Sequence, residues 1–141
     1  MLKLLLSCIY GVQGNLPAWP DDFKWSSAGR PNGYNCIKIT EGAEPHYTTW
    51  HDNYFCWRNF KSDPGLRWSS AGSIGNMRCT QISEGADPHT WHDNYLCERN
   101  DSPYKFTWTS SGKTAGKSCI RWLESADPAT WHDNYLCGNR H

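Results

Sequence analysis

Short runs in which apolar and polar residues alternate follow one another along most of the chain. This two-residue period is typical of a half-buried β-strand, and no stretch shows a sustained helical period. Several runs end at a glycine, as a strand entering a turn should. The pattern predicts short antiparallel strands within residues 23–27, 36–40, 52–57, 66–70, 79–83, 93–98, 105–110, 119–124 and 133–138.

The same strand pattern occurs three times. Trp25, Trp68 and Trp108 open the three copies at offsets of 43 and 40 residues, and a cysteine follows each tryptophan eleven positions later. A second cysteine closes each copy 20, 18 and 18 residues after the first. Such self-similarity is typical of a repeat architecture. We therefore predict a single all-β domain over residues 15–141, with repeats at about 21–63, 64–103 and 104–141 that each contain three or four short antiparallel strands.

The number of repeats limits the architecture. A β-propeller is built from more blades than three. Two closed threefold arrangements remain, a β-prism of three small sheets or a β-trefoil. The chain is rich in tryptophan, with nine, so we expect a core that depends on aromatic rings and disulfides more than on aliphatic side chains.

Six of the seven cysteines belong to the repeats, two in each. An even set of cysteines in a small exported chain indicates a disulfide framework. Threefold symmetry leaves one within-repeat pairing and two cyclic pairings between repeats. Within-repeat pairing is the simplest, because each pair of strands can place its two cysteines side by side. We expect the bridges Cys36–Cys56, Cys79–Cys97 and Cys119–Cys137.

The first fourteen residues have the outline of a secretion signal. Lys3 gives a positive start, residues 4–10 are mostly apolar, and small residues surround a cleavage point after Gly14. The alternatives are a buried N-terminal strand or a very short membrane anchor, although the apolar run is too short to cross a bilayer. We expect residues 1–14 to be removed and the mature protein to be secreted and extracellular.

Charge gives little indication of a charged partner. The chain carries 14 basic and 14 acidic residues, and loss of Lys3 with residues 1–14 leaves the mature chain with one excess negative charge. No run of basic residues occurs, so neither nucleic acid nor insertion into a membrane is expected.

Each repeat contains the string Trp-His-Asp-Asn before its last strand. An exposed tryptophan can cover the apolar face of a sugar, while carboxylate and amide groups bond to its hydroxyls. Histidine adds a group that titrates near neutral pH. The predicted ligand-binding residues are Trp50, His51, Asp52, Asn53, Trp91, His92, Asp93, Asn94, Trp131, His132, Asp133 and Asn134.

The same string also has a structural interpretation. Asp and Asn can bond to neighbouring backbone and hold a sharp turn into the last strand. Strand alternation places Trp91 and Asp93 on one face and His92 and Asn94 on the other, so one pair should face inward. For Trp25, Trp68 and Trp108 the core interpretation is favoured. Tyr54, Tyr95 and Tyr135 are also expected to serve mainly in packing.

Catalysis is not expected. Acid–base catalysis needs one asymmetric constellation of groups with separately tuned pKa values, whereas the candidate groups here come in three near-equal copies. No nucleophile or metalloprotease motif occurs in the chain. Glu, Asp and Asn could supply oxygens to a calcium ion, but no calcium-binding loop motif is present. We expect no catalytic residue, no metal and no cofactor.

The order of features in "GNMRCTQISEGADPHTWHDNYLC", residues 75–97, resembles the threefold repeat of the vitelline-membrane outer-layer protein family. It is more distantly similar to the Cys-bounded units of dermatopontin-like proteins. The resemblance implies a secreted β-prism that binds glycans or matrix. It favours a prism over a trefoil, as does the absence of the Q-x-W motif of ricin-type trefoil lectins.

Together these features predict a small secreted lectin with up to three related shallow sites, whose partners are glycans or glycoproteins. Triplicate weak sites gain avidity against a clustered ligand. The alternative is a structural protein of an extracellular matrix or coat, in which the repeated string is a folding joint without a soluble ligand. The sequence leaves the sugar and the oligomeric state open.

Overall fold

The computed structural model describes residues 16–40, 52–59, 64–83, 93–123 and 132–140. This part of the chain is all-β and contains no helix. The expected signal, residues 1–14, lies outside the described residues. The strands are β1 (Phe23–Ser26), β2 (Asn35–Lys38), β3 (Tyr54–Trp57), β4 (Arg67–Ser69), β5 (Met77–Gln81), β6 (Tyr95–Arg99), β7 (Thr107–Thr109), β8 (Ser118–Arg121) and β9 (Tyr135–Gly138).

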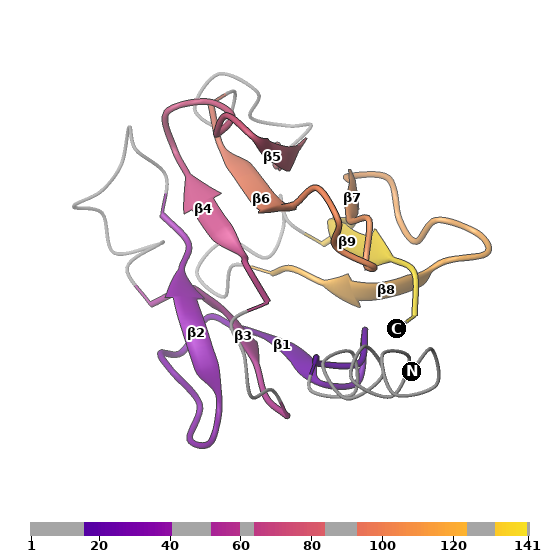
Figure 1. The fold of residues 1–141 in the computed structure, drawn as a ribbon. Helices are drawn as coiled ribbons and strands as arrows, with labels where there is room; N and C mark the ends of the chain where they lie inside the picture. Colours follow the sequence, from indigo (N-terminus) through magenta and orange to yellow (C-terminus); the bar gives the residue numbers. More distant parts are fainter. Residues whose placement is uncertain (1–15, 41–51, 60–63, 84–92, 124–131, 141) are drawn as a thin grey trace, which may run out of the picture.

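Each repeat forms its own three-stranded sheet. The strand orders are β1-β3-β2, β4-β6-β5 and β7-β9-β8, so the last strand of every repeat lies in the middle. This middle strand is antiparallel to both of its neighbours. Figure 1 shows the three sheets placed around a common centre, as the sides of a prism are. The predicted threefold all-β fold is confirmed.

Strand alternation gives each sheet one face toward the centre and one face toward solvent. In the first sheet Phe55 on β3 lies directly between Trp25 on β1 and Ile37 on β2. Phe55 is fully buried, and Trp25 and Ile37 pack against the same core. Tyr54 and Cys56 flank Phe55 in the chain, so their side chains lie on the opposite, outer face.

The core is shared by all three repeats and is largely aromatic. Trp122 lies at its centre, and its ring stacks on Trp25 at a centroid distance of 4.5 Å. The rings of Trp68 and Trp108 approach Trp122 to 6.4 Å and 5.4 Å. The predicted core role of the three repeat tryptophans is confirmed, although each of their rings is only half-buried. The buried cluster is Trp19, Phe23, Ile39, Phe55, Trp57, Leu66, Ile82, Leu96, Tyr104, Phe106, Trp122 and Leu136.

The three repeat tryptophans also link each repeat to another. Each indole Nε1 donates a hydrogen bond to a backbone carbonyl that follows the second strand of a different repeat, and the three bonds form a closed circle. These bonds join Trp25 to Leu123, Trp68 to Thr40, and Trp108 to Ser83, at 2.9, 2.9 and 2.7 Å.

A disulfide joins the second and third strands of every sheet, as the cysteine spacing predicts. In each sheet the two cysteines lie directly opposite each other, with their Cα atoms 4.0 to 4.1 Å apart. Three such bridges indicate folding in an oxidising compartment. The bridges are Cys36–Cys56, Cys79–Cys97 and Cys119–Cys137.

The threefold symmetry is broken most strongly at the buried position directly after the second cysteine of each repeat. Trp57, Glu98 and Gly138 occupy this position, and all three are buried. In the third repeat, Trp19 from the N-terminal segment fills the space: a Cβ at Gly138 would lie 3.1 Å from its Nε1. That Nε1 donates to the carbonyl of Ser118 at 3.0 Å. The N-terminal segment thus supplies the core side chain that the third repeat lacks.

Candidate functional site

The Asp-Asn pair of the repeated string directly precedes the middle strand of each sheet, and its backbone holds both outer strands. The carbonyl of the aspartate accepts a hydrogen bond at 2.9 Å from a glycine in the turn after the first strand. That glycine has a φ near +90°, which side chains other than glycine rarely tolerate. The aspartate–glycine pairs are Asp52–Gly29, Asp93–Gly72 and Asp133–Gly112.

The carbonyl of the asparagine forms a second set of bonds. It accepts from the backbone N–H of the residue after the second strand, at 2.8 to 3.0 Å. The two adjacent carbonyls therefore bond the residues before the middle strand to the turn after the first strand and to the end of the second strand. The pairs are Asn53–Ile39, Asn94–Ile82 and Asn134–Trp122.

The side chains of the Asp-Asn pair lie in different surroundings. Asn53, Asn94 and Asn134 are 0% exposed, which favours a structural role for these three predicted ligand residues. The aspartates at the preceding position are all exposed. Five predicted ligand residues lie outside the described part of the chain: Trp50, His51, Trp91, His92 and Trp131.

The third repeat shows how the histidine of the string lies. His132 Nε2 is 3.2 Å from Asp133 Oδ2, and both side chains are more than half exposed. Strand alternation would place these two neighbours on opposite faces. The structure differs because both residues belong to a turn, and β9 begins only at Tyr135. In this repeat an imidazole and a carboxylate are therefore presented to solvent together.

A half-buried tyrosine follows each aspartate two residues later and lies on the outer face of its sheet. In the first repeat Tyr54 lies opposite Ser26 and Lys38. The guanidinium of Arg30 covers its ring at 5.2 Å. In the third repeat Lys113 lies over the ring of Tyr135 at 5.8 Å.

The alternating pattern of the strands does not predict these cation–tyrosine contacts. Arg30 and Lys113 stand five residues after the repeat tryptophan, where the second repeat has Ser73. Comparison of the copies column by column would have shown this variable position. Nothing in the strand pattern alone shows that the turn folds back over the tyrosine.

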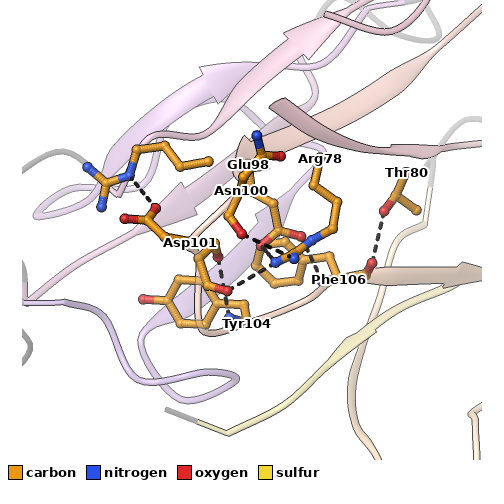
Figure 2. A network of polar contacts seen from close by, with 9 residues as sticks. Arg78, Thr80, Glu98, Asn100, Asp101, Tyr104 and Phe106 are labelled. Carbon is orange, nitrogen blue, oxygen red and sulfur yellow. Dashed lines mark hydrogen bonds and ion pairs between the residues drawn. The ribbon is translucent and has the colours of Figure 1, made fainter. Parts of the chain in front are cut away.

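A buried carboxylate lies between the second and third repeats (Figure 2). Glu98 is 1% exposed, and its Oε2 accepts a hydrogen bond at 2.8 Å from the backbone N–H of Phe106. Its Oε1 lies 3.5 Å from Arg78 Nη2, the nearest charged group. The carbonyl of Phe106 accepts from Thr80 Oγ1 at 2.9 Å. Both backbone groups of Phe106 are thus bound by side chains of the preceding repeat.

Arg78 extends this network to the loop between the repeats. Its Nη2 donates to the carbonyl of Ser102 at 3.0 Å, and its Nη1 donates to the carbonyl of Asn100 at 3.4 Å. The hydroxyl of Ser102 in turn accepts from the backbone N–H of Tyr104. These contacts stay within the second repeat and its junction with the third. We interpret the Glu98 network as a structural clamp between two repeats.

Within the described ranges, His, Cys, Asp and Glu side chains form no group of three that could hold a metal ion. The described residues include no helix long and apolar enough to cross a membrane. The candidate site consists of the exposed aspartates of the string and the outer-face tyrosines. Comparison of the chain with known protein families, curated proteins and solved structures gave no match.

Proposed function

We propose that the protein is a secreted carbohydrate-binding protein with up to three related shallow sites. The observation that carries this proposal is one carboxylate repeated at equivalent surface positions. Asp52, Asp93 and Asp133 are all exposed, and each lies two residues before an outer-face tyrosine. The backbone carbonyls of each Asp-Asn pair, which we call the joint, bond to both outer strands of the sheet. Each carboxylate therefore projects from a fixed backbone position.

This arrangement suits sugar hydroxyls. An exposed carboxylate accepts charge-assisted hydrogen bonds from adjacent hydroxyls, and the tyrosine adds a phenol group, while a cation covers its ring in the first and third repeats. In the third repeat His132 adds a further polar group beside Asp133. The tryptophan of the string, which precedes the aspartate by two residues, remains the predicted stacking partner for the sugar ring.

Repetition supports binding over catalysis. Three equivalent sites on one rigid scaffold can bind a branched or polymeric glycan simultaneously, and the gain in avidity compensates for weak individual sites. The resemblance to the vitelline-membrane outer-layer protein family is in line with a secreted threefold glycan binder. The three disulfides are in line with an extracellular location.

One observation favours a second candidate, a structural protein of a matrix or coat. The backbone of every Asp-Asn pair holds the strands of its sheet together, and the three asparagine side chains are buried. A joint with these contacts would be needed in each repeat even without a ligand. In this alternative the exposed carboxylates bind no soluble sugar and contact only the neighbouring macromolecules of the assembled matrix or coat.

A sugar titration separates the two candidates. Intrinsic tryptophan fluorescence of the full chain is followed during titration with neutral oligosaccharides chosen from a glycan array. The triple variant D52N/D93N/D133N keeps every backbone contact and removes the three carboxylate charges, so we expect its affinity to fall at least about tenfold. D101N is the matched control, because Asp101 is exposed and pairs only with Arg99 among the described residues. No response to any glycan, or equal affinities of the triple variant and wild type, contradicts the lectin proposal.

A further inference from the structure

We propose that the outer face of the first sheet binds an anionic polysaccharide, one whose sugar units carry sulfate or carboxylate groups. This inference rests on the proposed function only in taking the ligand to be a glycan. It names a ligand class, anionic glycans, and a binding surface that differ from those proposed for the repeated aspartates. The surface is the cationic strip, defined here as Lys24, Arg30, Lys38 and Arg58.

The strand register places the middle of the strip on the solvent side of the sheet. Lys24 lies opposite Cys56, and Lys38 lies opposite Tyr54. Directly opposed residues of antiparallel strands share a face, and Tyr54 and Cys56 are two positions apart on the same strand. Phe55, between them, points into the core. Lys24 and Lys38 therefore project from the same outer face.

Two tyrosine rings orient the cations of the strip. Arg30 covers the ring of Tyr54 at 5.2 Å. Lys24 and Arg58 both contact the ring of Tyr34, at 5.8 and 5.6 Å. Such contacts attract a cation to the ring face and restrict a long side chain before any ligand arrives. A restricted side chain loses less entropy when it binds an anion.

Most of the positive charge of the strip is not paired within the part of the chain that the structure describes. Lys24, Arg30 and Lys38 are exposed, and none of them forms an ion pair with another described residue. Arg58 pairs with Asp22, at 3.3 Å between Nε and Oδ1, but its side chain remains 49% exposed. The exposed Asp52 lies at the Tyr54 end of the strip and limits the charge there.

The other two repeats lack this full set at the equivalent positions. The second repeat has Ser73 and Gln81 in place of Arg30 and Lys38, and its Arg99 pairs with Asp101 at 3.4 Å. The third repeat keeps two cations, Lys113 and Arg121, but has Thr107 and Asn139 in place of Lys24 and Arg58. Since all three sheets fold alike, the cations of the strip are not required by the fold.

The shape of the strip suits a chain of regularly spaced anions. From Tyr54 to Arg58 the middle strand and its continuation span about 13 Å, at roughly 3.3 Å per residue. Single-stranded nucleic acid is the competing polyanion. It binds through bases that stack on open aromatic rings, whereas Tyr34 and Tyr54 lie beneath cations. A polysaccharide whose anions contact the cations does not need such stacking.

The test measures binding of the full chain to four probes by isothermal titration calorimetry at two salt concentrations. The probes are dextran sulfate, carboxymethyl dextran, uncharged dextran and a single-stranded oligodeoxynucleotide. The variant R30S/K38Q gives the first repeat the residues that the second repeat carries naturally. The matched control K113S/R121Q makes the same two replacements at the equivalent positions of the third repeat. Circular dichroism and the Tm confirm that both variants fold.

We expect wild type to bind an anionic dextran and to lose affinity as salt rises. R30S/K38Q should weaken that binding about 30-fold, roughly fivefold for each cation removed, and K113S/R121Q by less than about threefold. Three results overturn the inference: no binding to either anionic dextran, equal effects of the two double variants, or equal or tighter binding of the oligonucleotide. If neutral glycans bind and anionic dextrans do not, only this inference fails. If dextran sulfate binds through the strip and no neutral glycan binds, the strip stands and the aspartate sites fail.

Discussion

Glu98 offers the most direct test of how the repeats are joined. Its carboxylate is buried, and it is the hydrogen-bond acceptor of the Phe106 N–H at 2.8 Å. We expect E98A to leave that buried N–H without an acceptor, which costs about 1 to 3 kcal/mol. The lost contact with Arg78 adds little, about 0 to 1 kcal/mol, because that side chain is 34% exposed and can be hydrated. The free energy of unfolding should therefore fall by about 1 to 4 kcal/mol.

The matched variant is E98Q. A glutamine is nearly the same size and retains an oxygen that can accept from Phe106, so only the charge is lost. We expect E98Q to cost about half as much as E98A, because hydrogen bonds to charged groups are roughly twice as strong as neutral ones. The comparison therefore separates the loss of the acceptor from the loss of the charge.

Equilibrium unfolding in guanidinium chloride, with all disulfides intact, measures both variants. Tryptophan fluorescence is a suitable probe because Trp122 lies in the middle of the core. Linear extrapolation gives the free energy, and unchanged m-values confirm that the same surface unfolds. The reasoning is refuted if E98A lies within about 0.5 kcal/mol of wild type, the usual range for surface substitutions. It is also refuted if E98Q destabilises the protein as much as E98A.

Three further predictions concern the joint, the N-terminal segment and the bridges. G72A should lower the free energy of unfolding in denaturant by about 1 to 2 kcal/mol, because Gly72 has a φ of +97° and its N–H must still reach the Asp93 carbonyl. An unchanged denaturant midpoint would show that the stability of the fold does not depend on this bond. Burial alone would raise the pKa of Asp22, but hydrogen bonds from Ala18, Asn59 and Arg58 hold it below its usual 3.8. The resulting stabilisation is present above pH 3.8 and is lost as the pH falls through the lower pKa of the folded state. We therefore expect the Tm of D22N to fall less on acidification than the Tm of wild type. Parallel curves of Tm against pH would contradict this. Replacing Cys79 and Cys97 by serine should cost about 3 kcal/mol, measured as the shift in denaturant midpoint times m, and no shift would show that this bridge adds no stability.

The sequence predicts features that depend on local spacing and on repetition. The alternating runs locate all nine strands of the described residues, because strand alternation is a local property. The spacing of the cysteines predicts their pairing, since the symmetry leaves few possibilities. The string predicts bonds from the side chains of Asp52 and Asn53 to neighbouring backbone, whereas the bonds that hold the strands are accepted by their backbone carbonyls.

Other features depend on how the repeats meet and could not be predicted from one copy. Glu98 would be assigned to the surface by its residue type, and only the position of Phe106 from the next repeat explains its burial. Trp19 lies before the first repeat, so no periodicity indicates that it fills the space beside Gly138. The outward turn of both His132 and Asp133 depends on where β9 begins, a boundary that alternation alone does not define.

The closed circle of indole–carbonyl bonds has a consequence for the origin of the chain. Every repeat contributes one donor tryptophan and one acceptor carbonyl, so a single repeat of about 40 residues carries both halves of the bond that would link it to an identical copy of itself. The present chain has lost that interchangeability. With Trp57, Glu98 and Gly138 at the equivalent buried position, each repeat fits only one of the three places in the ring. If the gene of an ancestral self-assembling trimer was triplicated and fused, its repeats could diverge in this way. The different buried side chains would then fix the order of the repeats along the chain.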